Sequence, residues 1–206
     1  MKVVITAGPT REYIDPVRFL SNPSTGKMGF AIAEAAVKAG YEVVLVAGPV
    51  SLPTPRGVRR IDVVSARDMY RAVQREIKDA TIFIASAAVA DWRPKCCAKH
   101  KLKKGGMCNI LELTRNPDIL KSVKAPVKIG FAAETNDVLA EGRRKCREKH
   151  LKFIVVNDVT KRGSGFAVDT NEVSFVYASG EVKAFACMSK RKVATTIISA
   201  AAKFIA

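Results

Sequence analysis

Hydrophobic positions in this chain alternate between short continuous runs and stretches with helical spacing. Val3, Val4 and Ile5 form an apolar run typical of a buried strand, and residues 27–39 have helical spacing that ends at Gly40, a residue suited to a left-handed helix end. Further strand-like runs follow at residues 42–47, 58–64, 81–86, 127–132 and 153–156. Between two of them Ser65 and Asp68 form a helix start, with Met69, Val73 and Ile77 on one face. Nearly continuous apolar strands that alternate with helices predict a parallel sheet covered on both faces.

The second half continues this alternation and then changes it. Asn116 and Pro117 predict a capped helix over residues 117–124, and Asn136 predicts the start of another helix that runs to about His150. Residues 172–177 and 181–186 are separated by Ala-Ser-Gly, which predicts an antiparallel hairpin. Ser189 starts a final helix whose inward positions are Val193, Ile197, Ala201 and Ile205. We therefore expect a single α/β domain over residues 1–206, three-layered and Rossmann-like, with a mostly parallel sheet and a C-terminal antiparallel hairpin extension.

About twenty polar residues separate the first strand from the first helix, and we expect neither helix nor strand among them. In a dinucleotide-binding fold this connection is a tight glycine turn, so a loop of this length indicates a role in chemistry. Its candidate groups are Arg11, Asp15, Arg18, Asn22, Ser24 and Thr25. We expect part of an active site here.

The end of this loop has the chemistry of an anion site. Ser24, Thr25, Gly26 and Lys27 precede a helix N-terminus, where backbone N–H groups and the helix dipole favour a phosphate. The alternative, that Ser24 or Thr25 only caps the helix, is equally compatible with the residues. A Walker A motif does not fit, because Met28 stands where Ser or Thr is required.

Two later segments also carry candidate groups. Residues 84–94 (IASAAVADWRP) place small side chains at the C-terminal end of a strand, with Asp91 and Arg93 as polar candidates for ligand contact. Residues 101–104 (KLKK) precede Gly-Gly, and a lysine on such a loop can neutralise a polyphosphate. Read alone, this run is more typical of a solvated charge cluster.

Composition narrows the function classes. The net charge of +16 admits nucleic acid, a membrane surface or small polyanions as partners, but the nine Phe, four Tyr and one Trp do not alternate with the basic runs. We expect no nucleic-acid and no membrane partner. The absence of a long apolar span or leader predicts a cytoplasmic protein, and five cysteines predict reduced thiols. Cys96, Cys97 and His100 have the wrong spacing for zinc, so no metal site is predicted from the protein side chains.

Taken together, six ordered segments resemble one enzyme family over nearly the whole chain. They are GPTREYIDPVRFLSNPSTGKMGFAIA, AAVADWRP, KLKK, NPDIL, GFAAET and VVNDV. The family is phosphopantothenoylcysteine synthetase of the bacterial, CTP-using type. The resemblance implies a ligase of coenzyme A biosynthesis that joins 4′-phosphopantothenate to L-cysteine through an acyl cytidylate, converting CTP to CMP and diphosphate with Mg²⁺.

The resemblance also implies residue roles. Asn22 matches the residue that holds the acyl intermediate, with Arg18 supporting its loop, and Lys101 matches the lysine that forms the cytidylate. Ser24, Thr25 and Gly26 are expected to bind substrate phosphate. The positions expected to contact the nucleotide are Ala85, Ser86, Ala87, Asp91, Lys101, Pro117, Asp118, Ile119, Leu120, Phe131, Lys145 and Lys149.

The family further implies a homodimer in which a protruding segment closes the partner's site. Most bacterial members are fused behind a flavin-dependent phosphopantothenoylcysteine decarboxylase, so we expect a separate synthetase or an excised domain, and no FMN binding. The choice of CTP over ATP comes from the resemblance alone. Two alternatives are an NAD(P) dehydrogenase, which would need the missing GxGxxG and Tyr-x-x-x-Lys motifs, and a basic nucleic-acid-binding protein.

Overall fold

The core of the protein is one eight-stranded sheet. The computed structural model describes residues 1–103, 110–134, 137–158, 165 and 168–205. The strands run in the order β12-β11-β10-β9-β6-β1-β4-β5, and the six from β10 to β5 are parallel. Their bounds are β1 Lys2–Ala7, β4 Glu42–Ala47, β5 Val58–Asp62, β6 Ile82–Ala85, β9 Val127–Glu134, β10 Phe153–Asp158, β11 Thr170–Tyr177 and β12 Val182–Ser189.

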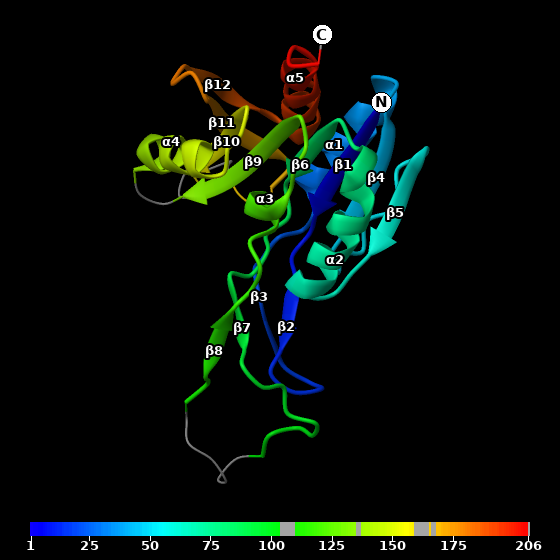
Figure 1. Ribbon diagram of the computed structural model, residues 1–206, viewed down its shortest axis with the longest axis vertical. Coiled ribbons are helices and arrows are strands. Elements are labelled where there is room, and N and C mark those ends of the chain that lie inside the picture. Colours follow the sequence, from blue (N-terminus) through cyan, green and yellow to red (C-terminus); the bar gives the residue numbers. More distant parts are fainter. Residues whose placement is uncertain (104–109, 135–136, 159–164, 166–167, 206) are drawn as a thin grey trace.

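Helices cover both faces of this sheet, which confirms the predicted three-layer α/β fold (Figure 1). Helices α1 (Lys27–Lys38) and α5 (Lys190–Ala202) pack on one face. Helices α2 (Ala66–Glu76), α3 (Ile119–Ser122) and α4 (Val138–Glu148) pack on the other, and the short 3₁₀ turn η1 (Ile77–Asp79) continues α2. All six residues of β1 are buried, because both of its faces meet helices.

The C-terminal hairpin is present as predicted. Strand β11 pairs antiparallel with both β10 and β12. Aromatic side chains fix this end of the sheet: the Phe153 and Phe175 rings stack with centroids 5.0 Å apart, and Phe175 and Phe185 lie 4.7 Å apart. None of the helices within the described residues is long and apolar enough to cross a membrane.

Two predicted helix starts are correct and one is wrong. Ser65 and Asp68 form a reciprocal capping box, and the Ser189 hydroxyl accepts from the Lys192 N–H. Asn116 does not cap α3. Its amide donates to the carbonyl of Ala90 at 2.8 Å, and Asp118 caps a shorter helix instead. The predicted cap Asn136 lies outside the described residues, and Asp137 directly precedes α4.

The opening loop is not irregular throughout, contrary to our expectation. It contains β2 (Arg11–Tyr13) and β3 (Phe19–Ser21), which pair antiparallel, and a second pair forms from β7 (Trp92–Pro94) and β8 (Leu113–Arg115). Figure 1 shows both pairs projecting together away from the eight-stranded sheet. We call the described parts of residues 10–21 and 92–115 the arm. Three-residue strands are too short for hydrophobic alternation to reveal them.

Buried bonds fix the base of the arm. The Glu12 side chain is only 3% exposed, and its carboxylate accepts from the N–H of Ala66, the first residue of α2, at 2.8 Å. The Arg11 N–H donates to the carbonyl of Val64 at 2.9 Å. The arm therefore leaves the sheet from a fixed attachment beside α2.

Candidate active site

Two adjoining cavities lie at the edge where parallel strands β1, β6, β9 and β10 end. This is the edge at which open α/β sheets bind ligands. The first cavity has a volume of about 190 Å³ and the second about 600 Å³. Ala87, Val89 and Phe131 line both, so these three residues form a shared wall. A ligand in one cavity therefore lies next to a ligand in the other.

The start of α1 forms one side of the first cavity. Ser24, Thr25, Gly26 and Lys27 line it, as expected of a phosphate-binding turn. Gly26 has a positive φ of 77°, which favours glycine, and no side chain caps α1. Ser24 Oγ instead accepts from the Gly26 N–H at 3.4 Å. The cap residue of α1 is Gly26, and neither Ser24 nor Thr25 takes that position.

Glycine at position 29 brings this helix start close to the sheet. A Cβ atom there would lie 2.5 Å from the Cβ of Ala7, at the end of β1. Only glycine permits this approach without displacing backbone. The close packing sets the positive end of the helix dipole at the edge where the strands end.

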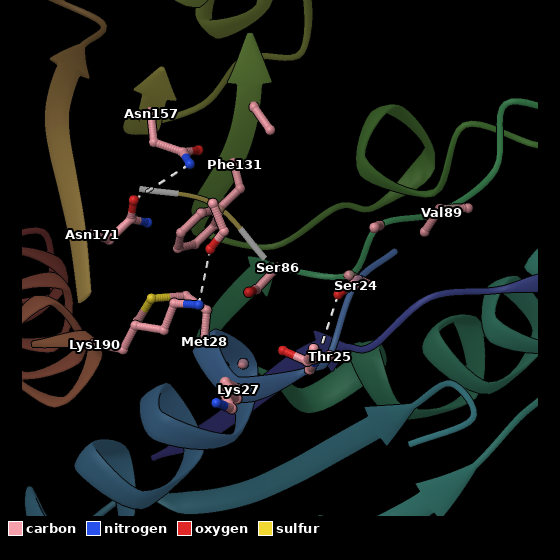
Figure 2. A pocket seen from close by; sticks show the side chains of 16 residues that line it. Ser24, Thr25, Lys27, Met28, Ser86, Val89, Phe131, Asn157, Asn171 and Lys190 are labelled. Atoms are coloured by element: carbon pink, nitrogen blue, oxygen red, sulfur yellow. Dashed lines mark hydrogen bonds between the residues drawn. The ribbon is translucent and has the colours of Figure 1, made fainter. Parts of the chain in front are cut away.

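The opposite side of the first cavity carries polar residues that sequence reasoning did not select. Asn157 from β10, Asn171 from β11 and Lys190 at the start of α5 line the cavity and are buried (Figure 2). Asn157 Nδ2 donates to Asn171 Oδ1 at 3.4 Å, and Lys190 Nζ donates to the Gly165 carbonyl at 3.0 Å. Burial lowers the pKa of Lys190, and nearby Lys27 lowers it further. Asn157 stands at the end of its strand, a position that topology could have indicated.

Ser86 lies in the first cavity rather than the second. We predicted nucleotide contact for this residue, but it lines the cavity formed by α1. Its hydroxyl oxygen is buried and has no hydrogen-bond partner among the described residues. A buried polar atom of this kind favours a ligand that completes its bonding.

The second cavity brings together most of the predicted nucleotide contacts. Its lining includes Ala85, Ala87, Asp91, Pro117, Asp118, Ile119, Leu120, Phe131, Lys145 and Lys149. Lys149 Nζ lies 3.1 Å from Asp118 Oδ2, and Asp118 also caps α3. These residues come from α3, α4, β6, β9 and the segments next to them. The fold therefore brings together residues that are far apart in the sequence. Lys145 in the last turn of α4 and Lys149 directly after the helix both line this cavity, in agreement with the single helix face that their four-residue spacing predicts.

Arg93 has a structural role that differs from our expectation. It does not line either cavity; its guanidinium donates to the carbonyl of Arg115 and, at 3.1 Å, to Asn116 Oδ1. Asn116 in turn holds the Ala90 carbonyl. Arg93 therefore fixes the segment that leads from β8 into the wall of the second cavity.

Asn22 lies beside the shared wall. Its Nδ2 donates to the carbonyl of Ala88 at 3.1 Å, and Ala88 stands between the shared residues Ala87 and Val89. The side chain is thus next to the junction of the cavities, although it is not part of either lining.

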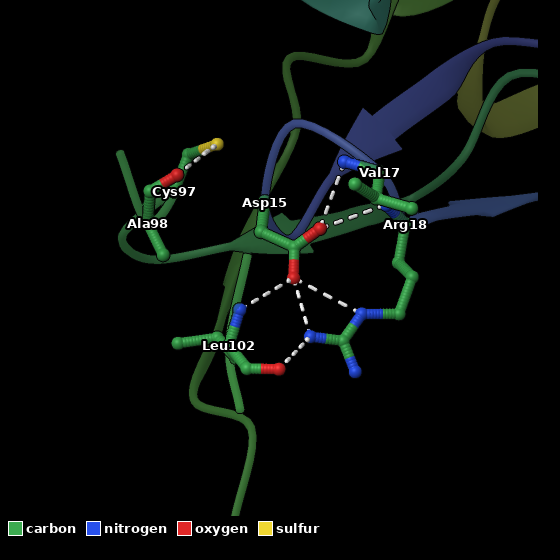
Figure 3. A network of polar contacts seen from close by, with 6 residues as sticks. All are labelled: Asp15, Val17, Arg18, Cys97, Ala98 and Leu102. Carbon is green, nitrogen blue, oxygen red and sulfur yellow. Dashed lines mark hydrogen bonds and ion pairs between the residues drawn. The ribbon is translucent and has the colours of Figure 1, made fainter. Parts of the chain in front are cut away.

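Arg18 and Lys101 belong to the arm and line neither cavity. Figure 3 shows the network that joins their two segments. The fully buried Asp15 carboxylate accepts from the Arg18 guanidinium and from the Leu102 N–H at 3.1 Å. Arg18 also donates to the Leu102 carbonyl at 3.0 Å. Arg18 therefore supports the segment that carries Lys101, and not only the Asn22 loop as expected. Lys104 lies outside the described residues.

The same network fixes the ionisation of Asp15. The guanidinium of Arg18 and the N–H groups of Val17, Arg18 and Leu102 hold the pKa of this carboxyl well below its ordinary value. Both Val17 and Arg18 donate from their backbone at 2.9 Å. At neutral pH the carboxylate is thus a charged link between the β2–β3 turn and the Lys101 segment.

Within the described residues, no three His, Cys, Asp or Glu side chains gather as a metal-binding group. Cys96 and Cys97 are exposed free thiols. Any divalent cation at this edge would need further ligands, which nucleotide phosphates supply in many sites.

Comparison with known proteins places nearly the whole chain in one protein family. Residues 1–205 match the family described as DNA/pantothenate metabolism flavoprotein C-terminal domain. The chain is 50% identical over 203 residues to the coenzyme A biosynthesis bifunctional protein CoaBC of Bacillus subtilis (strain 168), a match covering 95% of this chain and 50% of that protein. The chain thus spans about half the length of the curated relatives it matches.

Solved structures with the same fold include members of this family. The crystal structure of the C-terminal domain of a CoaBC protein has a TM-score of 0.81 at 42% identity, covering 97% of this chain and 92% of that one. A Cab2 mutant in complex with phosphopantothenate-cysteine has a TM-score of 0.81 at 17% identity, covering 99% of this chain and 87% of that one, a likeness of fold. The chain belongs to the DNA/pantothenate metabolism flavoprotein C-terminal domain family.

Proposed function

We propose that this protein is a ligase that joins 4′-phosphopantothenate to L-cysteine by way of an acyl cytidylate in coenzyme A biosynthesis. The observation that carries the proposal is the shared wall. One cavity begins at an uncapped helix N-terminus suited to a phosphate ester, and the adjoining cavity gathers the residues expected to contact a nucleotide. Two substrates bound in this way meet at Ala87, Val89 and Phe131.

The reaction needs charge stabilisation more than a nucleophilic side chain. The pantothenate carboxylate attacks the α-phosphorus of CTP, and diphosphate leaves with the electron pair of the broken P–O bond. The cysteine amine then attacks the acyl carbonyl, loses a proton, and displaces CMP to leave an amide. Lys145 and Lys149 in the second cavity are positioned to neutralise nucleotide phosphates, and Asn22 lies where the acyl group would meet the shared wall.

The described residues fit a Mg²⁺ ion that is carried by the nucleotide. Magnesium in nucleotide sites keeps several waters and takes one or two protein carboxylates together with phosphate oxygens. Asp91 supplies such a carboxylate from the wall of the second cavity, while Asp118 is paired with Lys149. The ion would neutralise charge on the polyphosphate. That this chain binds no FMN stays a prediction.

The arm supports a homodimer. Arg18 and Lys101 are expected to act in catalysis, yet both lie on the arm and outside the cavities. Exposed apolar side chains accompany them: Tyr13 is 38% exposed, Trp92 45% and Leu113 44%. Apolar side chains on a projecting element favour a protein partner. We propose that each arm reaches a second copy and supplies Lys101 to its site.

The cytoplasm is the compartment that this proposal requires. Cys96, Cys97 and Cys187 are exposed and form no disulfide, which favours a reducing environment. The product, phosphopantothenoylcysteine, would pass to a decarboxylase, either separate or fused to the same polypeptide.

The decisive experiment mixes the protein with phosphopantothenate, Mg²⁺, cysteine and either CTP or ATP. We expect diphosphate and CMP in equal amounts, with amide formation dependent on cysteine. Diphosphate release with ATP but not CTP would keep the ligase and overturn the choice of nucleotide. No diphosphate with either nucleotide would overturn the ligase itself.

A further inference from the structure

Two segments that are far apart in the sequence both line the second cavity. One runs from Val89 to Trp92 and the other from Arg115 to Leu120. They meet at the short pair β7–β8, where Trp92 is opposite Arg115. Beyond that pair, a ligand that contacts both segments at once needs a further link that holds them at a fixed spacing.

The residue that supplies this link is Asn116. Its Nδ2 donates to the Ala90 carbonyl at 2.8 Å, and its backbone N–H donates to the Asp91 carbonyl at 2.8 Å. Its Oδ1 accepts from the Arg93 guanidinium at 3.1 Å. One half-buried side chain and its own N–H therefore bond to three residues of the other segment and of β7.

The bonding partners of Asn116 require an amide side chain. A carbonyl oxygen can only accept and a guanidinium can only donate, so the side chain between Ala90 and Arg93 must do both. The same partners fix the amide orientation, with nitrogen toward Ala90 and oxygen toward Arg93. An aspartate would lose the bond to Ala90 at neutral pH, and an apolar side chain would lose both bonds.

The Ala90 residue is also held from its other side. Its N–H donates to Thr10 Oγ1 at 3.0 Å, and Thr10 is fully buried. The Thr10 carbonyl in turn accepts from Ser21 Oγ at 2.8 Å. Because both peptide groups of Ala90 are bonded to side chains, Asn116 connects the segment before α3 to a point fixed near the end of β1.

The groups that depend on this connection lie in the second cavity. The Asp91 carboxylate is exposed, lines the cavity, and has no hydrogen-bond or ion-pair partner among the described residues. Pro117 and Asp118 directly follow Asn116 and line the same cavity. A shift of Asn116 would therefore move two groups of expected nucleotide contacts relative to each other.

We propose that Asn116 is a positioning residue of the nucleotide cavity, which sets Asp91 and the start of α3 at the spacing that a bound nucleotide contacts. The inference deepens the proposed function and takes the identity of the nucleotide from it. Asn116 acts through Ala90 and with the help of Arg93. Its loss weakens nucleotide binding and leaves binding of the acid substrate unchanged.

The test uses the only tryptophan of the chain, Trp92, which lines the second cavity. Its fluorescence during titration with CTP and Mg²⁺, with calorimetric titration in parallel, measures nucleotide binding without turnover. For Asn116→Leu we expect the Kd for CTP to rise about 10-fold, the value of one hydrogen bond at the upper end of its usual range. In the ligase assay the KM for CTP should rise in parallel, and the KM for phosphopantothenate should stay at the wild-type value.

Arg93→Met separates positioning from direct contact, because Arg93 lines neither cavity. We expect the Kd for CTP to rise about threefold, since the Asn116 amide keeps its bond to Ala90 but loses the donor that orients it. The double variant should bind CTP no more weakly than Asn116→Leu alone, because both changes act through one amide. Multiplied effects in the double variant would overturn this link.

Gln74→Leu is the matched control. Gln74 is also a half-buried amide, and its Nε2 donates to Ser122 Oγ at 3.0 Å, which attaches it to α3 away from both cavity linings. We expect its Kd for CTP to match wild type. An equal loss in Gln74→Leu, or a KM for phosphopantothenate that rises as much as the KM for CTP in Asn116→Leu, would mean general loosening and would overturn the proposal.

Thermal unfolding midpoints show which variants are folded. If Asn116→Leu does not fold, Arg93→Met decides alone: a raised Kd for CTP supports the proposal and a wild-type Kd overturns it. The two proposals also fail in different ways. CTP binding that depends on Asn116, without any diphosphate release, would overturn the ligase and leave the positioning role standing. Full ligase activity with a wild-type KM for CTP in both variants would do the reverse.

Discussion

The cavities and the arm are built by different means, although both carry residues expected to act in one reaction. The cavities lie at the edge of a sheet whose strands and helices bury their side chains on both faces. The arm consists of two pairs of three-residue strands with apolar side chains exposed, and the buried carboxylate of Asp15 links the β2–β3 turn to the Lys101 segment. The comparison indicates that the cavities are fixed by the packed core, whereas the arm is held mainly by a few polar bonds and carries its charged residues outside the cavities.

Lys101→Gln tests the arm most severely. We expect diphosphate release to fall about 10³-fold, because the charge that would neutralise the developing polyphosphate is removed from a preorganised site. The measurement is diphosphate release in a single turnover, and the control is Lys103→Gln, an exposed lysine two residues away on the same segment.

Mixed dimers test whether Lys101 acts in the site of its own protomer or in the site of the second copy. Ala87→Phe should fill the shared wall and inactivate its own cavities. Co-expressed with Lys101→Gln, it should restore about a quarter of wild-type activity, because half of the dimers are mixed and each has one intact site. No recovery in purified mixed dimers would place Lys101 in its own protomer's site.

Asn22→Asp tests the junction of arm and core. An aspartate cannot donate to the Ala88 carbonyl, and its charge would repel that oxygen and the acyl phosphate. We expect the amide-forming step to slow about 100-fold, by the loss of one well-placed donor. Rapid-quench measurement should show a normal burst of diphosphate, followed by acyl cytidylate that cysteine consumes slowly. A lost burst would assign Asn22 to the first step instead.

Lys149→Met tests the core side of the comparison. Lys149 is paired with Asp118, so its removal leaves that carboxylate facing the nucleotide cavity. We expect the KM for CTP to rise about 10-fold, the value of one charge-assisted hydrogen bond at a partly exposed site, with kcat little changed. Lys152→Met, a lysine outside the cavity lining, is the control. An equal effect on the KM for phosphopantothenate would contradict the division into two cavities.

Asp15→Asn is expected to change activity no more than Lys149→Met does, with a loss of about 10-fold in kcat through displacement of the Lys101 segment. It also has a pH signature. Because the folded pKa of Asp15 is lowered from its ordinary 3.8, its stabilisation is complete above that value and is lost as pH falls toward the folded pKa.

Urea unfolding of wild type and Asp15→Asn from pH 7 to pH 3 measures this signature. The difference in unfolding free energy between the two proteins should stay constant down to about pH 4, which is close to the pKa of the carboxyl group in the unfolded chain. Below that pH the difference should become smaller. A constant difference across the whole range would mean that the ionised carboxylate does not stabilise the arm.

Much of the core could be predicted from the sequence because its signals are local. The apolar run in β1, the Ser65–Asp68 capping box and the Ser189 cap each depend on a few neighbouring residues, and all three are confirmed. The residues expected to contact the nucleotide came from the family resemblance of the ordered motifs. The structure brings most of these residues to the second cavity. The wrong cap at Asn116 has a tertiary cause, since its side chain is engaged by Ala90 and Arg93.

The arm and the buried end of the first cavity could not be predicted for a physical reason. Residues 11–13 and 19–21 form strands only because they pair with each other and pack beside β7. Lys190 stands in a basic run that is typical of a solvated surface, and only the fold buries it. Long-range packing creates both features.

The shared wall has a consequence for ligand design. If the proposed function holds, a molecule that links a phosphate ester to a nucleoside monophosphate would span both cavities across Ala87 and Phe131. Its second half would bind as an intramolecular event at a millimolar effective concentration, so two weak fragments could combine into one tight inhibitor.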